Sequence, residues 1–297
     1  MAMRSLTDDM DHYHRAFGVY HRVADRYNVL SQWVNTELRQ AFKSMNVNYT
    51  DGKEDMKILS IGPGDGEIEN QILRILRDGH EPPRPIKATI VEPAVDMVYR
   101  YKTRVVKDTA QLTDISYDWR AETLDAYLEN GENDGAKFHF ISALHSIYYA
   151  SDMQAAIKDL YGRLEDGGIL LMVVISDKSG FGRFGSNFPL MWGSRHHHPT
   201  SAQVLAACQN ENIPIDQEFI TKVQANITPC FNDPQDMTQD GRLLVDFFTH
   251  VADFLKDAQP ETKKEVLEFL GGKLCAEKRE DGQVYFHGDW KAFIIRR

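Results

Sequence analysis

Long apolar runs and cysteines are scarce in this sequence. Its 297 residues contain no stretch of the roughly 18 apolar residues that a membrane-spanning helix needs, so we expect no such helix. Residues 1–8 lack the apolar segment of a secretory signal. The three cysteines, Cys208, Cys230 and Cys275, are odd in number and lack metal-ligand spacing. This pattern favours free thiols in a reducing cytoplasm over a disulfide framework.

Positive charge is scarce as well. The chain has 34 lysines and arginines against 44 aspartates and glutamates, which gives a net charge of −10. Such a chain repels a nucleic-acid backbone on average, so we expect no nucleic-acid partner and a small or cationic substrate instead. The 42% hydrophobic content over 297 residues is enough for one large core with appendages.

The most informative stretch is an expected strand, a glycine-rich turn and a helix. Residues 57–61 are mostly apolar and predict a buried strand. Three alternate glycines follow it: Gly62, Gly64 and Gly66. Apolar residues at helical spacing come next: Ile68, Ile72, Ile75 and Leu76. We expect Gly79 to end that helix with a positive φ. The glycines permit a sharp turn and close approach of a ligand, as in nucleotide-type cofactor sites.

A carboxylate ends the second expected strand and narrows the choice of cofactor. Glu92 follows Gly66 by 26 residues, where doubly wound folds place an acid against ribose hydroxyls. A dinucleotide site needs the spacing G-x-G-x-x-G and a helix N-terminus open to pyrophosphate. Here the third glycine comes one residue early, and Asp65 and Glu67 would oppose a pyrophosphate. We therefore favour S-adenosylmethionine, a sulfonium without phosphates, over NAD.

Alternating elements predict an α/β fold. We expect helices from residue 8 to 45, strands at 115–119 and 137–144, a helix at 153–164, a tight turn at 165–168 and a fifth strand at 169–176. Residues 177–199 mix glycines with aromatics and predict a mobile, aromatic-lined loop. Later expectations are a helix at 200–210, an extended segment at 219–231, helices at 241–257 and 260–270, and a hairpin at 284–295 with a Gly-Asp turn.

These elements make up a Rossmann-like fold. It has a seven-stranded, mostly parallel sheet with helices on both faces and a substrate-binding cap. We assign residues 53–180 with 215–297 to the cofactor-binding core, and residues 1–52 and 181–214 to a lid and cap. Residues 196–198 are three consecutive histidines. Adjacent side chains on a loop converge poorly on one ion, so we expect no metal.

At several places the sequence resembles the histamine N-methyltransferases, class I S-adenosylmethionine-dependent enzymes. The stretches that carry the resemblance are residues 3–6, 57–62, 66–68, 91–93, 122–123, 148–149 and 180–189. It covers nearly the whole chain and implies a methyltransferase that acts as a monomer. It also implies cofactor contacts at Gly62, Glu92, Met97, Leu124 and Leu144. The glycine loop and the strand ends add Pro63, Gly64, Gly66 and Thr123.

The positions that contact the substrate depart from the family pattern. Where the family has a glutamate that pairs with the substrate ammonium, this chain has Arg26, next to Asp25. A family glutamine becomes His145, and a family asparagine falls at about Gly288 or Asp289. An arginine repels an ammonium and attracts a carboxylate. The acceptor is then histamine-like, with Asp25 or Asp289 taking the ammonium, or a carboxylated imidazole or another small amine. A non-catalytic methyltransferase-like binding protein is a further alternative.

Methyl transfer to nitrogen is an in-line displacement that depends on alignment and exclusion of water. Tyr13 belongs to an N-terminal segment whose aromatics either pack in a core or face the ligand. We expect an aromatic box around cationic groups from four side chains: Tyr148, Tyr149, Phe181 and Phe184. His145 would hold the substrate ring or accept a proton.

Overall fold

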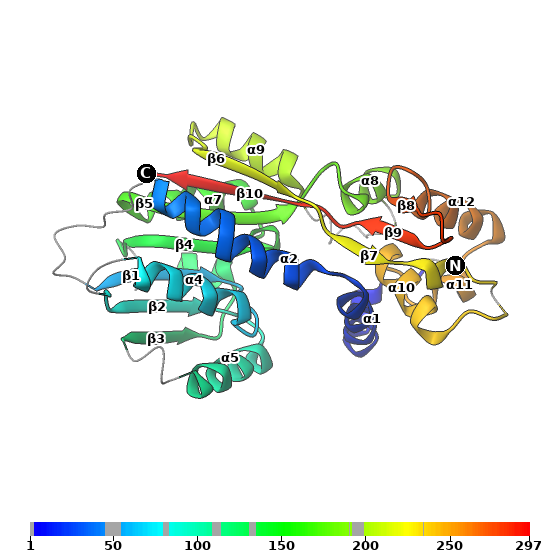
Figure 1. Ribbon diagram of the computed structural model, residues 1–297, viewed down its shortest axis with the longest axis horizontal. Coiled ribbons are helices and arrows are strands. Elements are labelled where there is room, and N and C mark those ends of the chain that lie inside the picture. Colours follow the sequence, from blue (N-terminus) through cyan, green and yellow to red (C-terminus); the bar gives the residue numbers. More distant parts are fainter. Residues whose placement is uncertain are drawn as a thin grey trace. The chain divides into compact units, whose positions relative to one another are not determined.

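The computed structural model describes residues 3–44, 55–79, 83–108, 114–130, 135–189, 191, 199–233 and 235–297 (Figure 1). The chain forms two compact units, each assembled from three segments. The first unit comprises Met1–Val29, Ile175–Ser201 and Ile220–Trp290; the second comprises Leu30–Val174, Ala202–Phe219 and Lys291–Arg297. These bounds differ from the predicted division, because residues 220–290 join the N-terminal segment and not the cofactor-binding core.

The predicted seven-stranded, mostly parallel sheet is confirmed, and it belongs largely to the second unit. Its strand order is β3-β2-β1-β4-β5-β10-β6. The strands are β1 (Met56–Ile61), β2 (Ile86–Val91), β3 (Ile115–Arg120), β4 (Phe138–Leu144), β5 (Leu164–Ile175), β6 (Gln217–Thr221) and β10 (Trp290–Arg296). The pairs β1–β2, β1–β4, β2–β3 and β4–β5 are parallel. The chain crosses from β3 at one edge, past β2 and β1, to β4, and such sheets bind ligands where the strand order reverses, between β1 and β4.

Helices cover both faces of this sheet because side chains alternate along each strand. Leu59 and Ile61 of β1 pack in one core cluster with α6 (Leu124–Glu129), α7 (Met153–Gly162) and α9 (Ser201–Asn210). The side chain of Ser60 points to the other face, where it bonds to α4 (Glu67–Asp78). Val98 and Tyr101 are the buried residues of α5 (Val95–Lys107), which follows β2. The expected alternation of strands and helices is therefore confirmed.

The first unit combines helices with a small sheet around an aromatic core. Its helices are α1 (Met10–Val23), α8 (Gly180–Asn187), α10 (Gln239–Thr249), α11 (Phe254–Asp257) and α12 (Pro260–Leu270). Its sheet has the order β7-β9-β8, from Gln224–Asn226, Val284–His287 and Ala276–Lys278. Both β7 and β8 pair with β9 in antiparallel fashion. Seven buried aromatics share this core: Tyr20, Phe181, Phe184, Phe247, Phe248, Phe254 and Phe286.

The predicted hairpin at 284–295 is wrong. β9 pairs with β7 and β8, whereas β10 lies between β5 and β6 in the large sheet. Gly288 and Asp289 therefore connect two sheets and do not form a turn. Hydrogen bonds hold this connection: Gly288 N–H donates to Val223 O at 2.8 Å, and Ser176 N–H donates to Asp289 O at 3.0 Å. The local pattern predicted both strands correctly but carried no information about their partners.

The predicted loop at 177–199 is partly wrong, because residues 180–187 form α8. The Ser179 hydroxyl caps it by accepting from Gly182 N–H at 3.1 Å. A Cβ at Gly180 would lie 2.5 Å from the Phe286 ring, and one at Gly182 would lie 2.6 Å from backbone oxygens. These glycines therefore permit close packing. The histidines at 196–198 lie outside the described residues.

Several smaller expectations also change. The predicted turn at 165–168 is an irregularity within β5, with Gly167 at φ 79° and a register shift against β4. The expected helix at 241–257 is interrupted at His250, which takes a left-handed conformation at the end of α10. Gly79 has φ −72°, so the positive φ expected there is wrong. A Cβ at Gly79 would lie 3.2 Å from the Ile75 carbonyl oxygen, and this crowding favours glycine.

The N-terminal helical prediction is confirmed by α1, α2 (Arg26–Trp33), a π-helical stretch (Val34–Leu38) and α3 (Arg39–Ser44). The described residues also contain three short 3-10 helices: Leu6–Asp8, Ile147–Tyr149 and Thr228–Phe231. Within that part of the chain, no helix has both the length and the apolar character that a bilayer crossing demands.

Candidate active site

The three loop glycines all have left-handed backbones but meet different surroundings. Their φ values are 59° at Gly62, 61° at Gly64 and 75° at Gly66. A Cβ at Gly62 would lie 2.6 Å from the Ser146 Cβ, and one at Gly66 would lie 2.1 Å from the Tyr101 ring. Around Gly64 no atom lies within 4 Å of that position. Two of the glycines thus allow tight packing, and Gly64 leaves room for a ligand against the backbone.

Glu92 connects the end of β2 to this loop. Its side chain is buried, with 7% exposed. One carboxylate oxygen accepts from Gly64 N–H at 2.9 Å, and the other accepts from Ala94 N–H at 3.0 Å. Each oxygen has a second lone pair, so both remain able to accept hydrogen bonds from ribose hydroxyls. The open backbone at Gly64 and this oriented acid fit an adenosyl group.

The acids of the loop are partly neutralised, which the sequence did not reveal. Arg104 of α5 donates through Nη2 to Asp65 at 2.7 Å and through Nε to the Asp65 carbonyl at 3.1 Å. Its guanidinium also lies 3.5 Å from the Glu67 carboxylate. The loop therefore repels a pyrophosphate less than its two acids alone would. The glycine spacing is unaffected and still favours S-adenosylmethionine.

The other predicted cofactor residues lie on the loops and helix starts that follow strands β1 to β4. Pro63 and Met97 are half-buried, Leu124 is buried, and the Thr123 hydroxyl accepts from Ala126 N–H at 3.2 Å as the cap of α6. Leu144 is half-buried as the last residue of β4. Carboxyl ends of parallel strands share one edge, so the structure brings the whole predicted cofactor set together.

The segment after β4 reaches the same edge. His145 has φ 54°, an unusual backbone for a non-glycine residue, and its N–H donates to Val173 O at 2.8 Å. Ser146, which the sequence did not single out, donates from its hydroxyl to Ile61 O at 2.6 Å and packs against Gly62. The rings of Tyr148 and Tyr149 lie 4.8 Å apart, and Tyr149 is 65% exposed.

The N-terminal substrate candidates lie in the first unit. Tyr13 is half-buried on α1, with its ring 6.1 Å from Phe17. Asp25 exchanges hydrogen bonds with Gln224: its carboxylate accepts from the Gln224 N–H at 2.8 Å, and its own N–H donates to Gln224 O at 3.0 Å. The carboxylate of Asp25 therefore already has a structural role at β7.

Arg26 is the first residue of α2 and is half-buried. Within the described part of the chain it forms no ion pair; its guanidinium lies 5.5 Å from the centre of the Tyr27 ring.

Burial raises the pKa of Tyr20 to about 12, while the positive charge of Arg26 opposes that rise. The Tyr20 hydroxyl also lies 3.3 Å from where a Cβ would stand at Gly288. Tyr20 thus lies near two predicted substrate positions, although its aromatic spacing in the sequence matches that of ordinary core residues.

The remaining candidates contribute to the interior of the first unit. Phe181 and Phe184 are 9% and 1% exposed, and the Phe181 ring centre lies 4.7 Å from that of Phe286. One oxygen of Asp289 accepts from Val223 N–H at 3.1 Å. Since Phe181 and Phe184 lie in the first unit and Tyr148 and Tyr149 in the second, the aromatic box stays a prediction.

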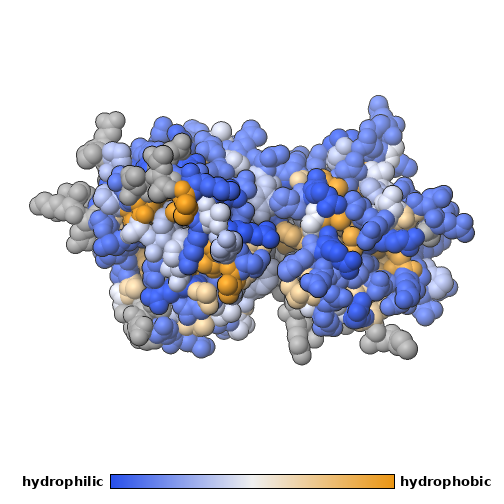
Figure 2. All heavy atoms as spheres, turned by 90° about the horizontal axis from the view of Figure 1, so that it is seen from below, coloured by the Kyte–Doolittle hydropathy of each residue, from blue (hydrophilic) through white to orange (hydrophobic). Residues whose placement is uncertain are grey.

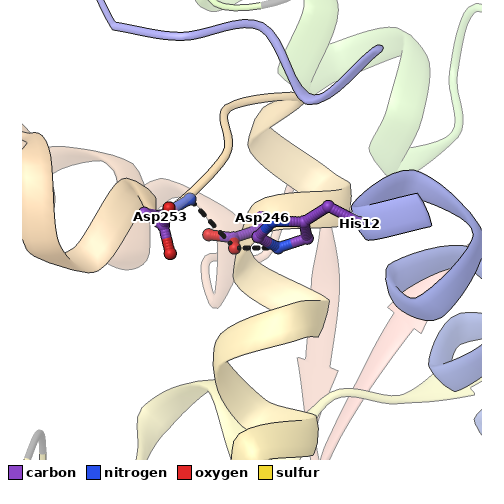
Figure 3. Close-up of side chains that lie close together, drawn as sticks. All are labelled: His12, Asp246 and Asp253. Carbon is purple, nitrogen blue, oxygen red and sulfur yellow. Dashed lines mark hydrogen bonds and ion pairs between the residues drawn. The ribbon is translucent and has the colours of Figure 1, made fainter. Parts of the chain in front are cut away.

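A second polar cluster lies in the first unit between α1 and α11 (Figure 3). Asp246 accepts through one oxygen from Asp253 N–H at 3.1 Å and lies 2.9 Å from His12 Nε2; its other oxygen accepts from Phe254 N–H at 2.9 Å. Burial raises the pKa of Asp246, and these hydrogen bonds oppose the rise. The ligand atoms of His12, Asp246 and Asp253 lie within 4.8 Å of one another, yet Asp253 already pairs with Arg4 at 3.0 Å. The cluster is therefore better explained as a clamp between helices than as a metal site.

Comparisons with known proteins agree with this geometry. A family model described as a methyltransferase domain matches residues 26–211. Histamine N-methyltransferase of Danio rerio is 26% identical over 296 residues, covering 98% of both chains. The Cavia porcellus protein of the same name is 27% identical over 289 residues, covering 96% of this chain and 95% of the relative.

Solved structures share the fold. A putative methyltransferase from Bacillus halodurans superposes with a TM-score of 0.52 at 14% identity, covering 86% of this chain and 96% of that one. The YcgJ protein from Bacillus subtilis gives a TM-score of 0.50 at 12% identity, covering 87% and 98%. At these identities the likeness concerns the fold alone.

Proposed function

This chain belongs to the methyltransferase domain family, and we propose that it methylates a nitrogen of a small, imidazole-containing, histamine-like amine. It is an S-adenosylmethionine-dependent methyltransferase. The observation that carries the proposed acceptor is similarity to histamine N-methyltransferases along 98% of the chain. Substrate-contacting segments of such relatives therefore have counterparts here, even where the residues differ.

Residues at the carboxyl edge of the sheet would bind the cofactor and align the acceptor with it. When bound, S-adenosylmethionine supplies a methyl group on a sulfonium, which an acceptor nitrogen attacks in line. Glu92 would accept hydrogen bonds from the ribose hydroxyls, and Gly64 would let the adenosyl group lie against the backbone. Ser146 fixes the segment that presents His145. His145 would hold the acceptor ring, so alignment, and not acid–base chemistry, supplies most of the rate.

A carboxylated acceptor is a second candidate, and Arg26 favours it. The family glutamate at this position pairs with an ammonium, whereas Arg26 carries the opposite charge and forms no ion pair within the described residues. A guanidinium binds a carboxylate through two parallel hydrogen bonds. Histidine or a histidine dipeptide has both a carboxylate and an imidazole nitrogen.

The test is an assay of S-adenosylhomocysteine release with histamine, histidine, carnosine, other biogenic amines and no acceptor. Turnover with histamine supports the first candidate, and turnover confined to carboxylated acceptors supports the second. Binding of S-adenosylhomocysteine without turnover on any acceptor would contradict both and favour the non-catalytic alternative.

Two substitutions sharpen this assay. Arg26→Glu restores the charge of the family glutamate, and we expect kcat/KM to shift toward histamine by about tenfold or more relative to carboxylated acceptors, equivalent to about 1.4 kcal/mol. Arg15→Glu, on the exposed side of α1, makes the same charge change and should leave the ratio unaltered. An unchanged ratio in both variants would remove Arg26 from acceptor recognition.

We also propose a cytoplasmic location and a monomeric state. Cys208, Cys230 and Cys275 are all free and buried, which supports a reducing cytoplasm as the location. The resemblance supports a monomer with a small-molecule substrate. Sedimentation of the purified protein measures the oligomeric state directly.

A further inference from the structure

A buried acid lies in α4, the helix that follows the glycine loop, and it has no role in the proposed binding of cofactor or acceptor. Glu69 of α4 is 2% exposed. The Ser60 hydroxyl donates to Glu69 Oε1 at 2.5 Å, and the Ser142 hydroxyl lies 3.1 and 3.0 Å from its two oxygens. Ser60 and Ser142 are partners in the β1–β4 register. One carboxyl group thus joins a helix to two neighbouring strands.

The position of this carboxyl relative to the loop is informative. Ser60 precedes Gly62 by two residues, and Glu69 follows Gly66 by three. Their hydrogen bond therefore closes a ring around the loop and connects its incoming strand to its outgoing helix. Ser142 lies on β4, the strand that leads to His145 and Ser146. The same carboxyl is bonded to both segments that approach the cofactor.

We propose that Glu69 is a positioning residue for the cofactor: in its ionised form it holds the ends of the glycine loop in the arrangement that binds the adenosyl group. An ionised carboxylate only accepts hydrogen bonds, so both serine hydroxyls can donate to it together. Protonation of Glu69 adds an O–H donor to this cluster, and a serine hydroxyl that accepts a hydrogen bond from it has to turn away from its present donation. The proposal rests on the cofactor and is independent of which acceptor is methylated.

The surroundings of Glu69 place its titration in the neutral range. Burial raises the pKa of Glu69 to about 7, and the hydrogen bonds from Ser60 and Ser142 oppose the rise. Tyr101 of α5 and Tyr117 of β3 face it; both are neutral phenols in this pH range, and burial raises their pKa values further. Farther along α4, Arg74 is already paired with Asp108 at 2.8 Å.

Tyr101 extends this arrangement to the far end of the loop. Its ring occupies the space beside Gly66, and the charges of Glu69, Arg104 and Asp65 all act on its hydroxyl. A change in the charge of Glu69 therefore acts on the residue whose ring packs against the loop. Cofactor affinity should rise as pH rises through about 7, when Glu69 loses its proton.

The test is calorimetric titration with S-adenosylhomocysteine, which binds without turnover, between pH 6 and pH 8.5. We expect wild-type affinity to rise by about tenfold over this range relative to Glu69→Gln, equivalent to one pKa unit of coupling. Titration of the ligand's own amine is common to both proteins and cancels in this ratio. Glu129→Gln removes an exposed acid of α6 and should keep the wild-type pH profile.

A second variant keeps the test decisive if Glu69→Gln does not fold. Ser142→Ala leaves the acid in place but removes one of its two serine partners, and we expect it to shift the midpoint of the pH profile upward. Glu69→Asp should recover part of the pH dependence. Identical pH profiles in wild type and Glu69→Gln, or in wild type and Ser142→Ala, would overturn the proposal. A pH-independent loss of affinity in these variants would do so as well, because it indicates only structural support.

Discussion

At the scale of residues, the three glycines of the loop share a left-handed backbone conformation, but two of them are closely packed and one is open. Gly62 and Gly66 are pressed against Ser146 and Tyr101, while Gly64 is open. The sequence predicted that the glycines and Glu92 contact the cofactor, because both follow a strand at a recognisable spacing. It could not predict Arg104, Ser146 or Glu69, because their partners come from other elements of the fold.

The contrast between Gly64 and Gly66 gives a matched pair of substitutions. Gly66→Ala places a methyl group 2.1 Å from the Tyr101 ring at φ 75°, so we expect a loss of about 3 kcal/mol or more in unfolding free energy. Gly64→Ala should cost only the left-handed backbone penalty of about 1–2 kcal/mol. Urea unfolding measures both values. Equal losses would contradict the assigned contacts.

Gly64→Ala should weaken ligand binding strongly, even though its expected loss of unfolding free energy is small. Its new methyl group would occupy the open side of the loop, so we expect the affinity for S-adenosylhomocysteine to fall by at least about tenfold, equivalent to about 1.4 kcal/mol. Calorimetric titration of the folded variant measures this. Wild-type affinity would show that the open backbone at Gly64 does not face the cofactor.

Glu69 also makes stability depend on pH. Because burial raises its pKa from 4.5 to about 7, the folded state holds this proton more tightly than the unfolded chain does. Its contribution to stability is full below the unfolded pKa and is lost as pH rises through about 7. Between pH 5 and pH 8 we expect wild type to lose about 2–3 kcal/mol more than Glu69→Gln in urea unfolding. A constant difference between the two proteins would contradict this titration.

At the scale of elements, the first unit depends on contacts between segments far apart in sequence. Asp246 of α10 lies within hydrogen-bond distance of His12 of α1 and accepts from the Asp253 N–H at the start of α11, as Figure 3 shows. Helix periodicity predicted these segments, but it did not show that a buried acid connects them. The partners of β9 and β10 were missed for the same reason, because alternation within a strand reports its faces and not its neighbours.

Removal of the Asp246 carboxylate should therefore destabilise the protein. Asp246→Ala leaves two backbone N–H groups and His12 without their acceptor, so we expect a loss of about 3–5 kcal/mol. Asp240→Ala, which removes only an exposed pair with Arg22, should cost less than about 1 kcal/mol. Thermal unfolding of the two variants tests the contrast. A similar small shift in both would show that the clamp is dispensable.

At the scale of the whole molecule, neither compact unit is a continuous piece of chain. The face drawn in Figure 2 is mainly polar with scattered apolar patches, in keeping with a core enclosed within each unit. The sequence predicted the class of fold, the number of strands in the large sheet and six of those strands, but it placed β6 only within an extended segment at 219–231. It placed the boundaries of the cap differently, because residues 220–290 contain strand and helix patterns that fit either unit.

This organisation makes residues 291–297 indispensable. β10 lies between β5 and β6, and Phe293, Ile294 and Ile295 are fully buried. We expect a chain that stops at Trp290 to be insoluble or unfolded, since it lacks an interior strand of the large sheet and these three side chains. Ile220→Ala, at a 65% exposed position, should fold normally. Cooperative unfolding of the shortened chain at the wild-type temperature would contradict this expectation.

The place of β10 also affects how the chain is made on the ribosome. β5 is almost wholly apolar from Ile169 to Val174, and its partner on one side comes from residues 290–296. While the intervening hundred or so residues are being translated, that edge of β5 has no strand to pair with. Open apolar edges of this kind are recognised by chaperones and initiate aggregation. The yield of active protein should consequently depend on chaperone supply and on translation speed across this interval.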